Sequence, residues 1–157
     1  VNVGAFIGED TMIDSHVLVG SCAQIGKRVH LSAGVQIGGV LEPIGEKPVI
    51  IEDDVFVGAG SVIVEGVHVK KGAVIAPGVS LSKALVIFDA TTGSFLEREA
   101  AVPENAVVVP GSRPCEKAKE SGINLYCPVI IKYKDQKTQK KLKLESALRN
   151  DDNKRKK

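Results

Sequence analysis

The side chains able to do catalytic chemistry are few, and the three histidines are the first set to consider. Three histidine ligands can hold a catalytic zinc ion, and the chain has only His16, His30 and His68. They are separated by 14 and 38 residues, so no two of them form a close pair. The cysteines offer no better set of ligands, and we therefore expect no metal site.

Two carboxylates form the second set. Asp14 follows Ile13 directly, at a position where glycine often stands elsewhere in the chain, and Glu65 lies in the segment IVEGV beside an expected turn. A carboxylate can serve as the general base that frees an attacking amine or hydroxyl in acyl transfer. The reaction also needs donors that stabilise a tetrahedral oxyanion. Spacing alone favours an ordinary solvated acid at both positions, so both interpretations stay open.

The composition limits the fold that must position these groups. The chain has 157 residues, of which 43% are hydrophobic but only 4% aromatic, and the apolar residues are mostly Val and Ile. Such β-branched residues favour strands over a helical bundle. The charged fraction of 25% is too low for a disordered chain. We therefore expect one all-β domain.

Charge and cysteine content exclude some partners. The net charge is +2, and the basic residues gather from Lys132 onward instead of along a surface interleaved with aromatics. We therefore expect no nucleic-acid partner. Cys22, Cys115 and Cys127 form neither a CxxC pair nor an even set, which favours a reduced, cytoplasmic setting. No apolar run reaches the ~18 residues of a membrane span, so no membrane partner is expected.

A six-residue repeat dominates the first half of the chain. Neither a helix nor an alternating strand has this period. It indicates short strands joined by tight turns, with one aliphatic side chain per strand in a narrow core. The aliphatic positions are Val1, Ile7, Ile13, Val19, Ile25, Leu31 and Ile37 in the first run, and Ile51, Val57, Ile63, Val69, Ile75, Leu81 and Ile87 in the second.

This repeat resembles that of the hexapeptide-repeat transferases, whose left-handed parallel β-helix has three hexads in each triangular coil. The resemblance predicts four to five coils over residues 1–88, interrupted by a loop over residues 38–50 where the phase shifts by two. With that shift, His30 and His68 would stack in one column two coils apart, too far to share an ion. A loop leaving a rigid solenoid is a common place for function.

Residues 89–150 are expected to cap the open end of the solenoid. Two strand-like runs, Ala106–Gly111 and Asn124–Lys134, predict a β-hairpin. Thr138–Arg149 predicts a short helix, because Leu144 and Leu148 fall four residues apart on one face. Solenoid ends need such caps. The basic residues 151–157 are expected to form a frayed tail.

Two segments carry a more specific resemblance. They are EDTMIDSHVLVGSCAQIGKRVHLSAGVQIGGVLEP (Glu9–Pro43) and PVIIEDDVFVGAGSVIVEG (Pro48–Gly66), and both are similar to tetrahydrodipicolinate N-succinyltransferases of lysine and diaminopimelate synthesis. The later segments VVVPG, LYCPVIIKY and ESALR resemble the cap of the same family. The resemblance implies a homotrimer with active sites between subunits. It also implies transfer of succinyl from succinyl-CoA to the amine of L-2-amino-6-oxopimelate, without a metal.

Site residues follow from this resemblance position by position. Asp14 matches the family's catalytic, substrate-binding aspartate, and Glu65 matches the acid of its VEG motif. The IGG backbone at Ile37–Gly39 is expected to help the chemistry, with an N–H of Gly39 donating to the thioester oxyanion. His30 and Ser32 match the HLS motif and are expected near the substrate.

Coenzyme A in similar enzymes lies along the edge of the coils. By this resemblance the backbone of Gly58, Ala59 and Ala76 is expected to bind it, with Lys83 near its phosphates. One departure concerns Val62, where several family members carry a further glutamate. The other concerns an N-terminal helical domain, with an arginine for a substrate carboxylate, that this sequence does not contain. The chain is therefore expected to be part of a longer protein, and its activity alone is left open.

Three alternatives remain. The N-acetyltransferase branch of the same pathway shares the EKPVIIEDDV-type loop and uses acetyl-CoA. A non-catalytic hexapeptide-repeat module for trimerisation would have the same repeat. A sugar or serine O-acetyltransferase is less favoured, because GSCAQIGK and the capping segments differ from that pattern.

Overall fold

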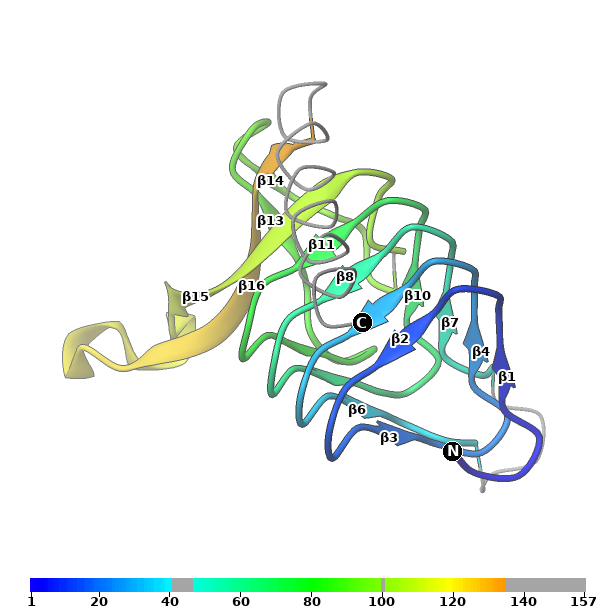
Figure 1. Ribbon diagram of the computed structural model, residues 1–157. Helices are drawn as coiled ribbons and strands as arrows, with labels where there is room; N and C mark the ends of the chain where they lie inside the picture. Colours follow the sequence, from blue (N-terminus) through cyan, green and yellow to red (C-terminus); the bar gives the residue numbers. More distant parts are fainter. Residues whose placement is uncertain (41–46, 100, 135–157) are drawn as a thin grey trace.

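The chain forms a left-handed parallel β-helix, as the repeat predicts (Figure 1). The computed structural model describes residues 1–40, 47–99 and 101–134. The coils are built from two-residue strands, whose bounds are β1 (Phe6–Ile7), β2 (Met12–Ile13), β3 (Leu18–Val19), β4 (Gln24–Ile25), β5 (His30–Leu31), β6 (Gln36–Ile37), β7 (Ile50–Ile51), β8 (Phe56–Val57), β9 (Val62–Ile63), β10 (His68–Val69), β11 (Val74–Ile75) and β12 (Ser80–Leu81).

These strands form three parallel sheets, one on each side of a triangular solenoid. Sheet A contains β1, β4, β7 and β10, sheet B contains β2, β5, β8 and β11, and sheet C contains β3, β6, β9 and β12. We name the turns between the sheets the A–B, B–C and C–A corners. The second residue of each strand points inward, and from β3 to β12 all of these aliphatic side chains are buried. The narrow core explains the excess of Val and Ile over aromatic residues.

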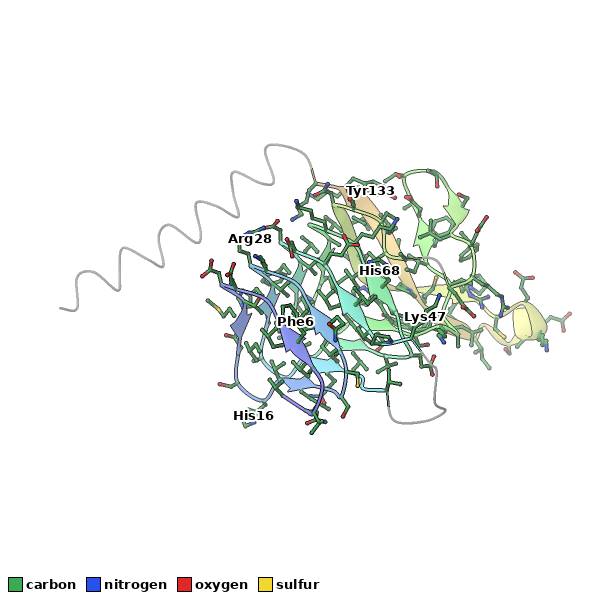
Figure 2. All side chains as sticks on the ribbon, turned by 90° about the vertical axis from the view of Figure 1, so that its right-hand side faces the viewer. Phe6, His16, Arg28, Lys47, His68 and Tyr133 are labelled. Atoms are coloured by element: carbon green, nitrogen blue, oxygen red, sulfur yellow. The ribbon has the colours of Figure 1, made fainter. Side chains whose placement is uncertain are left out.

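The loop before β7 is longer than the predicted two-residue shift. Ile51 pairs in register with Ile25, so the 14 residues from Ile37 to Ile51 replace one hexad of six. The loop therefore inserts eight residues, which changes the register of everything that follows. The prediction that His30 and His68 share a column is wrong: His30 belongs to sheet B, whereas His68 lies on sheet A in the same outer column as Phe6 (Figure 2).

The repeat also ends differently from the prediction. Ile87 was expected to be the last hexad position, but it stands just before β13 (Phe88–Asp89), which pairs with strands of the cap and not with a coil strand. Val102 instead pairs with Val69, and Val108 pairs with Ile75. These two valines are six residues apart, so the solenoid resumes after an excursion over residues 82–101. The excursion breaks the six-residue spacing, and the sequence pattern does not show that the next coil begins at Val102.

The predicted hairpin is present and longer than expected. β15 (Ala106–Pro114) and β16 (Asn124–Tyr133) are antiparallel, and β13 pairs with β16 and with β14 (Ser94–Phe95). A 3-10 helix, η1 (Glu116–Ser121), joins the two long strands, and the far end of the hairpin projects away from the coils (Figure 1). The predicted helix Thr138–Arg149 and the tail 151–157 lie outside the described residues.

Two glycines give a matched test of the coil geometry. A β-carbon on Gly20 would lie 2.2 Å from the Gly39 nitrogen, whereas a β-carbon on Gly60 would meet open space. Gly60 has φ of +67°, so alanine there suffers only backbone strain. We expect Gly20→Ala to lower the free energy of unfolding by about 3 kcal/mol, and Gly60→Ala by about 1 kcal/mol. Urea denaturation measures both; equal losses would contradict the close backbone packing at Gly20.

Asp89 joins β13 to the end of β16 within the cap. The residue is 2% exposed, and its carboxylate accepts hydrogen bonds from the Thr91 N–H at 2.8 Å, the Thr91 hydroxyl at 2.6 Å and the Tyr133 hydroxyl at 2.7 Å. Burial alone would raise the pKa of Asp89, but these donors outweigh it and the pKa is lowered. Burial and the neighbouring carboxylate raise the pKa of Tyr133 to about 12.

This junction predicts a pH-dependent stability. Because the pKa of Asp89 is lower in the folded state, its contribution is present above the unfolded value of about 4 and is lost as pH falls through the folded value. Tyr133→Phe removes one donor, so we expect a loss of about 1 kcal/mol at pH 7 that shrinks below pH 4. Denaturation midpoints at pH 7 and pH 3 measure the difference between variant and wild type. A difference that stays constant with pH would exclude this role.

Candidate functional site

Four of the predicted site residues stack in one column at the B–C corner. Asp14, Ser32, Gly58 and Ala76 follow β2, β5, β8 and β11, one on each successive coil. Two backbone hydrogen bonds of 2.9 Å fix their register. Asp14 N donates to Leu31 O, and Ser32 N donates to Val57 O. Coils are about 4.8 Å apart, so the column from Asp14 to Ala76 is about 14 Å long.

The turn residues beside this column leave the backbone uncovered. After Ser32, Gly58 and Ala76, the next two positions hold small residues. These turns are Ala33–Gly34, Ala59–Gly60 and Pro77–Gly78. No atom lies within 4 Å of where a β-carbon of Gly60 or Gly78 would be. An exposed strip of backbone therefore runs along the B–C corner, and we name it the corner strip.

The corner strip also differs from the other corners in its N–H groups. On the A–B and C–A corners, side-chain carboxylates accept hydrogen bonds from turn N–H groups at 2.8–3.1 Å: Asp53 from Lys27, Glu52 from Lys71, and Glu65 from Lys83. Within the described residues, no side chain accepts from the N–H of Ala33 or Ala59. These N–H groups remain available to an extended ligand that carries carbonyl groups.

Asp14 stands at one end of the corner strip with His30 beside it. Asp14 Oδ2 is 3.2 Å from His30 Nε2, and the His30 ring packs edge-on against Phe56 with centroids 5.0 Å apart. The Asp14 side chain is 40% exposed, compared with 22% for His30. His30 therefore orients a carboxylate that a ligand can still reach. The two side chains are therefore adjacent, and their role in one substrate site stays a prediction.

The other predicted site residues lie at the C–A corner, across sheet C from Asp14. Gly39 follows β6 and packs against Ser21, whose nitrogen lies 2.4 Å from where a Gly39 β-carbon would be. Glu65 follows β9 and its Oε2 accepts from the Lys83 N–H at 3.1 Å. One chain therefore brings together Asp14, His30, Ser32, Gly58, Ala59 and Ala76 in one group, and Gly39, Glu65 and Lys83 in another.

Val62 lies on the outer face of sheet C. It pairs with Gln36 on one side and Ser80 on the other. Across residues 1–40, 47–99 and 101–134, no three His, Cys, Asp or Glu side chains gather in a group that could hold a metal ion. In the same part of the chain, no helix has the length and apolar character needed to cross a bilayer.

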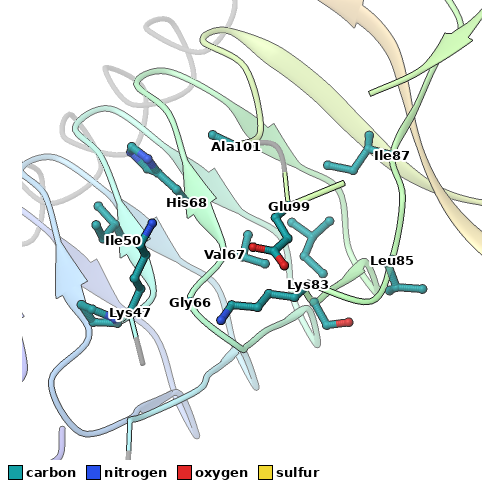
Figure 3. A pocket seen from close by; sticks show the side chains of 13 residues that line it. Lys47, Ile50, Gly66, Val67, His68, Lys83, Leu85, Ile87, Glu99 and Ala101 are labelled. Carbon is teal, nitrogen blue, oxygen red and sulfur yellow. The ribbon is translucent and has the colours of Figure 1, made fainter. Parts of the chain in front are cut away.

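Sequence reasoning missed a cavity of about 410 Å³ beside sheet A. It lies where the residues before β7 meet the excursion after β12, and Lys47, His68, Lys83 and Glu99 are among its lining residues (Figure 3). Neither segment follows the six-residue period, so no pattern in the sequence brings these side chains together.

Two family models match the repeat. Residues 4–39 match the bacterial transferase hexapeptide, and residues 48–83 match the hexapeptide repeat of succinyl-transferase. Curated relatives named 2,3,4,5-tetrahydropyridine-2,6-dicarboxylate N-succinyltransferase are similar over nearly the whole chain. Those from Bartonella bacilliformis and Acinetobacter baylyi are both 51% identical over 151 residues, covering 95% and 96% of this chain and 53% and 54% of the relative.

The chain thus spans about half the length of the curated relatives it matches. A solved structure of serine acetyltransferase from Neisseria gonorrhoeae, in complex with serine, superposes with a TM-score of 0.50 at 23% identity. That match covers 68% of this chain and 37% of the other, and it supports the β-helix fold alone. The chain therefore carries hexapeptide repeats like those of bacterial transferases, and over about half of their length it is similar to proteins named 2,3,4,5-tetrahydropyridine-2,6-dicarboxylate N-succinyltransferase.

Proposed function

We propose that the chain acts in a CoA-dependent N-acyltransferase, which moves succinyl from succinyl-CoA to the amine of L-2-amino-6-oxopimelate, the ring-opened form of tetrahydrodipicolinate. The names of its relatives support this substrate pair. The observation that carries the proposal is the corner strip, with an accessible carboxylate, Asp14, at one end.

The corner strip suits the pantetheine arm of coenzyme A. The arm is extended and contains two amides, and the three turns of the strip offer about 10 Å of exposed backbone that carries only small side chains. The N–H of Ala59 would donate to a pantetheine carbonyl, and any bulky side chain at Gly60 or Gly78 would obstruct the arm. The thioester then lies at the Asp14 end, and the nucleotide extends toward Ala76 and Pro77.

In the reaction the acceptor's amine attacks the thioester carbonyl carbon. Asp14 accepts a proton from the amine as the carbon–nitrogen bond forms. The carbon–sulfur bond then breaks, and the proton goes to the departing thiolate. His30, 3.2 Å from Asp14, holds the carboxylate in position. An N–H donor near the carbonyl oxygen, which we assign to Gly39, stabilises the oxyanion of the tetrahedral intermediate.

This assignment needs a neighbouring subunit, and we propose that the assembly is a homotrimer. Asp14 and Gly39 lie at different corners of one chain, with sheet C between them. A trimer whose B–C corner faces the C–A corner of the neighbouring subunit would join the two groups in one site, with Glu65 beside Gly39. We place the enzyme in the cytoplasm, where its free thiols at Cys22, Cys115 and Cys127 would stay reduced.

A comparison of acyl donors tests this function. Initial rates with succinyl-CoA and acetyl-CoA are measured on one preparation, with the same amino-oxopimelate acceptor. We expect kcat/KM for succinyl-CoA to exceed that for acetyl-CoA by roughly tenfold or more, because the site would hold the additional carboxylate. The reverse preference would assign the acetyl branch. No transfer, together with no coenzyme A binding by a confirmed trimer, would assign a non-catalytic scaffold.

A further inference from the structure

The long hairpin extends beyond the solenoid at the B–C corner. Val108 of β15 pairs with Ile75 of β11, and the coil below then turns into sheet C, whereas β15 continues to Pro114. The six residues after Val108 span about 20 Å in strand geometry. We name residues 113–125 the hairpin arm, and it projects away from the coils (Figure 1).

The base of the hairpin arm is fastened to the solenoid, but its apolar side chains are not covered. Tyr126 pairs with Ser112 across the hairpin, and its hydroxyl accepts a hydrogen bond from the Ser80 N–H of β12 at 2.7 Å. Further out, Ile123 is 55% exposed and Leu125 is 41% exposed. Exposed apolar side chains grouped on a fixed projection are typical of a protein–protein contact.

The cavity beside sheet A lies at the C–A corner, on the other side of sheet C. Gly66 and Val67 of its lining belong to the turn between β9 and β10, and Leu85 and Ile87 come from the excursion after β12 (Figure 3). Together these residues give the cavity of about 410 Å³ an apolar wall. Because sheet C separates the two corners, the hairpin arm points away from the cavity of its own chain.

Exposed charges on the hairpin arm and around the cavity are complementary. The turn of the hairpin arm carries Lys117 and Glu120, and the lining of the cavity includes Lys47 and Glu99. Each of the two surfaces therefore offers one acid and one base to the other. Charge pairs at the rim of an interface set the orientation of the partners more than the affinity.

We propose that the hairpin arm of one subunit docks in the cavity of the neighbouring subunit, where Ile123 and Leu125 pack against Val67, Leu85 and Ile87. The inference rests on the proposed function, whose site brings the B–C corner of one subunit to the C–A corner of the next. The contact joins two different surfaces, so it is heterologous, and three copies related by a three-fold axis close it into a ring.

Site-specific photocross-linking tests the docking. The photoreactive residue p-benzoylphenylalanine replaces Ile123 in the full chain. The matched control replaces Ile131, which is 48% exposed and belongs to the part of β16 beside the coils. Isotopically light and heavy chains are reassembled together before irradiation, so that mass spectrometry separates cross-links between subunits from those within one. We expect position 123, and not position 131, to cross-link to residues 47–50 or 82–101 of another subunit.

Glutamate at the same two positions measures how much the contact stabilises the assembly. Ile123→Glu would place a charge against the apolar wall. We expect the subunit concentration at half-dissociation to rise about tenfold or more, whereas Ile131→Glu should leave it unchanged. Sedimentation equilibrium measures both variants.

Neither experiment uses a substrate, so failure of the docking and failure of the proposed function are distinguishable. Cross-links from position 123 to the cavity of another subunit would support the docking even in a preparation without acyl transfer. The docking is overturned if position 123 cross-links only within its own subunit, to a different surface or not at all. Equal dissociation of the two glutamate variants would also overturn it.

Discussion

Replacing Asp14 with asparagine is expected to lower succinyl transfer by about 10²–10⁴-fold, the usual contribution of a general base. Asparagine has nearly the same shape and can still hydrogen-bond to His30, 3.2 Å away, so the local structure should persist. It cannot accept the proton that the attacking amine must lose. Steady-state turnover at saturating succinyl-CoA measures the effect, and the affinity for coenzyme A should change little.

Asp10→Asn provides the control for charge. Asp10 is an exposed acid at the A–B corner, four residues before Asp14 in sequence but at a different corner. Its replacement should leave turnover within about twofold, as expected for a surface change away from the site. Unchanged turnover in Asp14→Asn would remove this carboxylate from the mechanism.

Filling the corner strip should abolish most coenzyme A binding. Ala59 is exposed at the centre of the strip, and the adjacent Gly60 has open space beyond it. Ala59→Trp would place an indole ring over the backbone N–H groups that the pantetheine arm needs. We expect the Kd for coenzyme A to rise about 100-fold, equivalent to roughly 2.7 kcal/mol. Isothermal titration of wild type and variant measures it.

The same residue change at another corner is the control. Glu104 occupies the equivalent turn position, two residues after the buried Val102, but at the A–B corner. Glu104→Trp should leave the Kd for coenzyme A unchanged. If both variants bind as wild type does, or if both lose binding equally, the corner strip is not the coenzyme A site.

The sequence predicts the coils well because each hexad is a local pattern with its own core residue. Ile25, Leu31 and Ile37 stack as expected, since no insertion separates them. The pattern fails wherever an irregular segment intervenes. The loop before Ile51 adds eight residues instead of two, and the excursion after Leu81 moves the next coil position from Ile87 to Val102.

In the candidate site, too, the sequence predicts the positions within regular hexads but not those that depend on irregular segments. Asp14 and Ser32 are 18 residues apart, three hexads, so their stacking follows directly from the repeat. The alignment of Gly58 with them depends on the length of the inserted loop, which the pairing of Ile25 with Ile51 and of Leu31 with Val57 establishes. The cavity lined by Lys47 and Glu99 forms from segments without any period, and no spacing argument could have found it.

A crystal structure with bound coenzyme A tests the central claim most directly. The account predicts an extended pantetheine arm along the corner strip, with a carbonyl accepting a hydrogen bond from the Ala59 N–H and the sulfur at the Asp14 end. Coenzyme A ordered at the A–B corner, or in the cavity beside Lys47, would contradict the account. A corner strip left empty at saturating coenzyme A would contradict it equally.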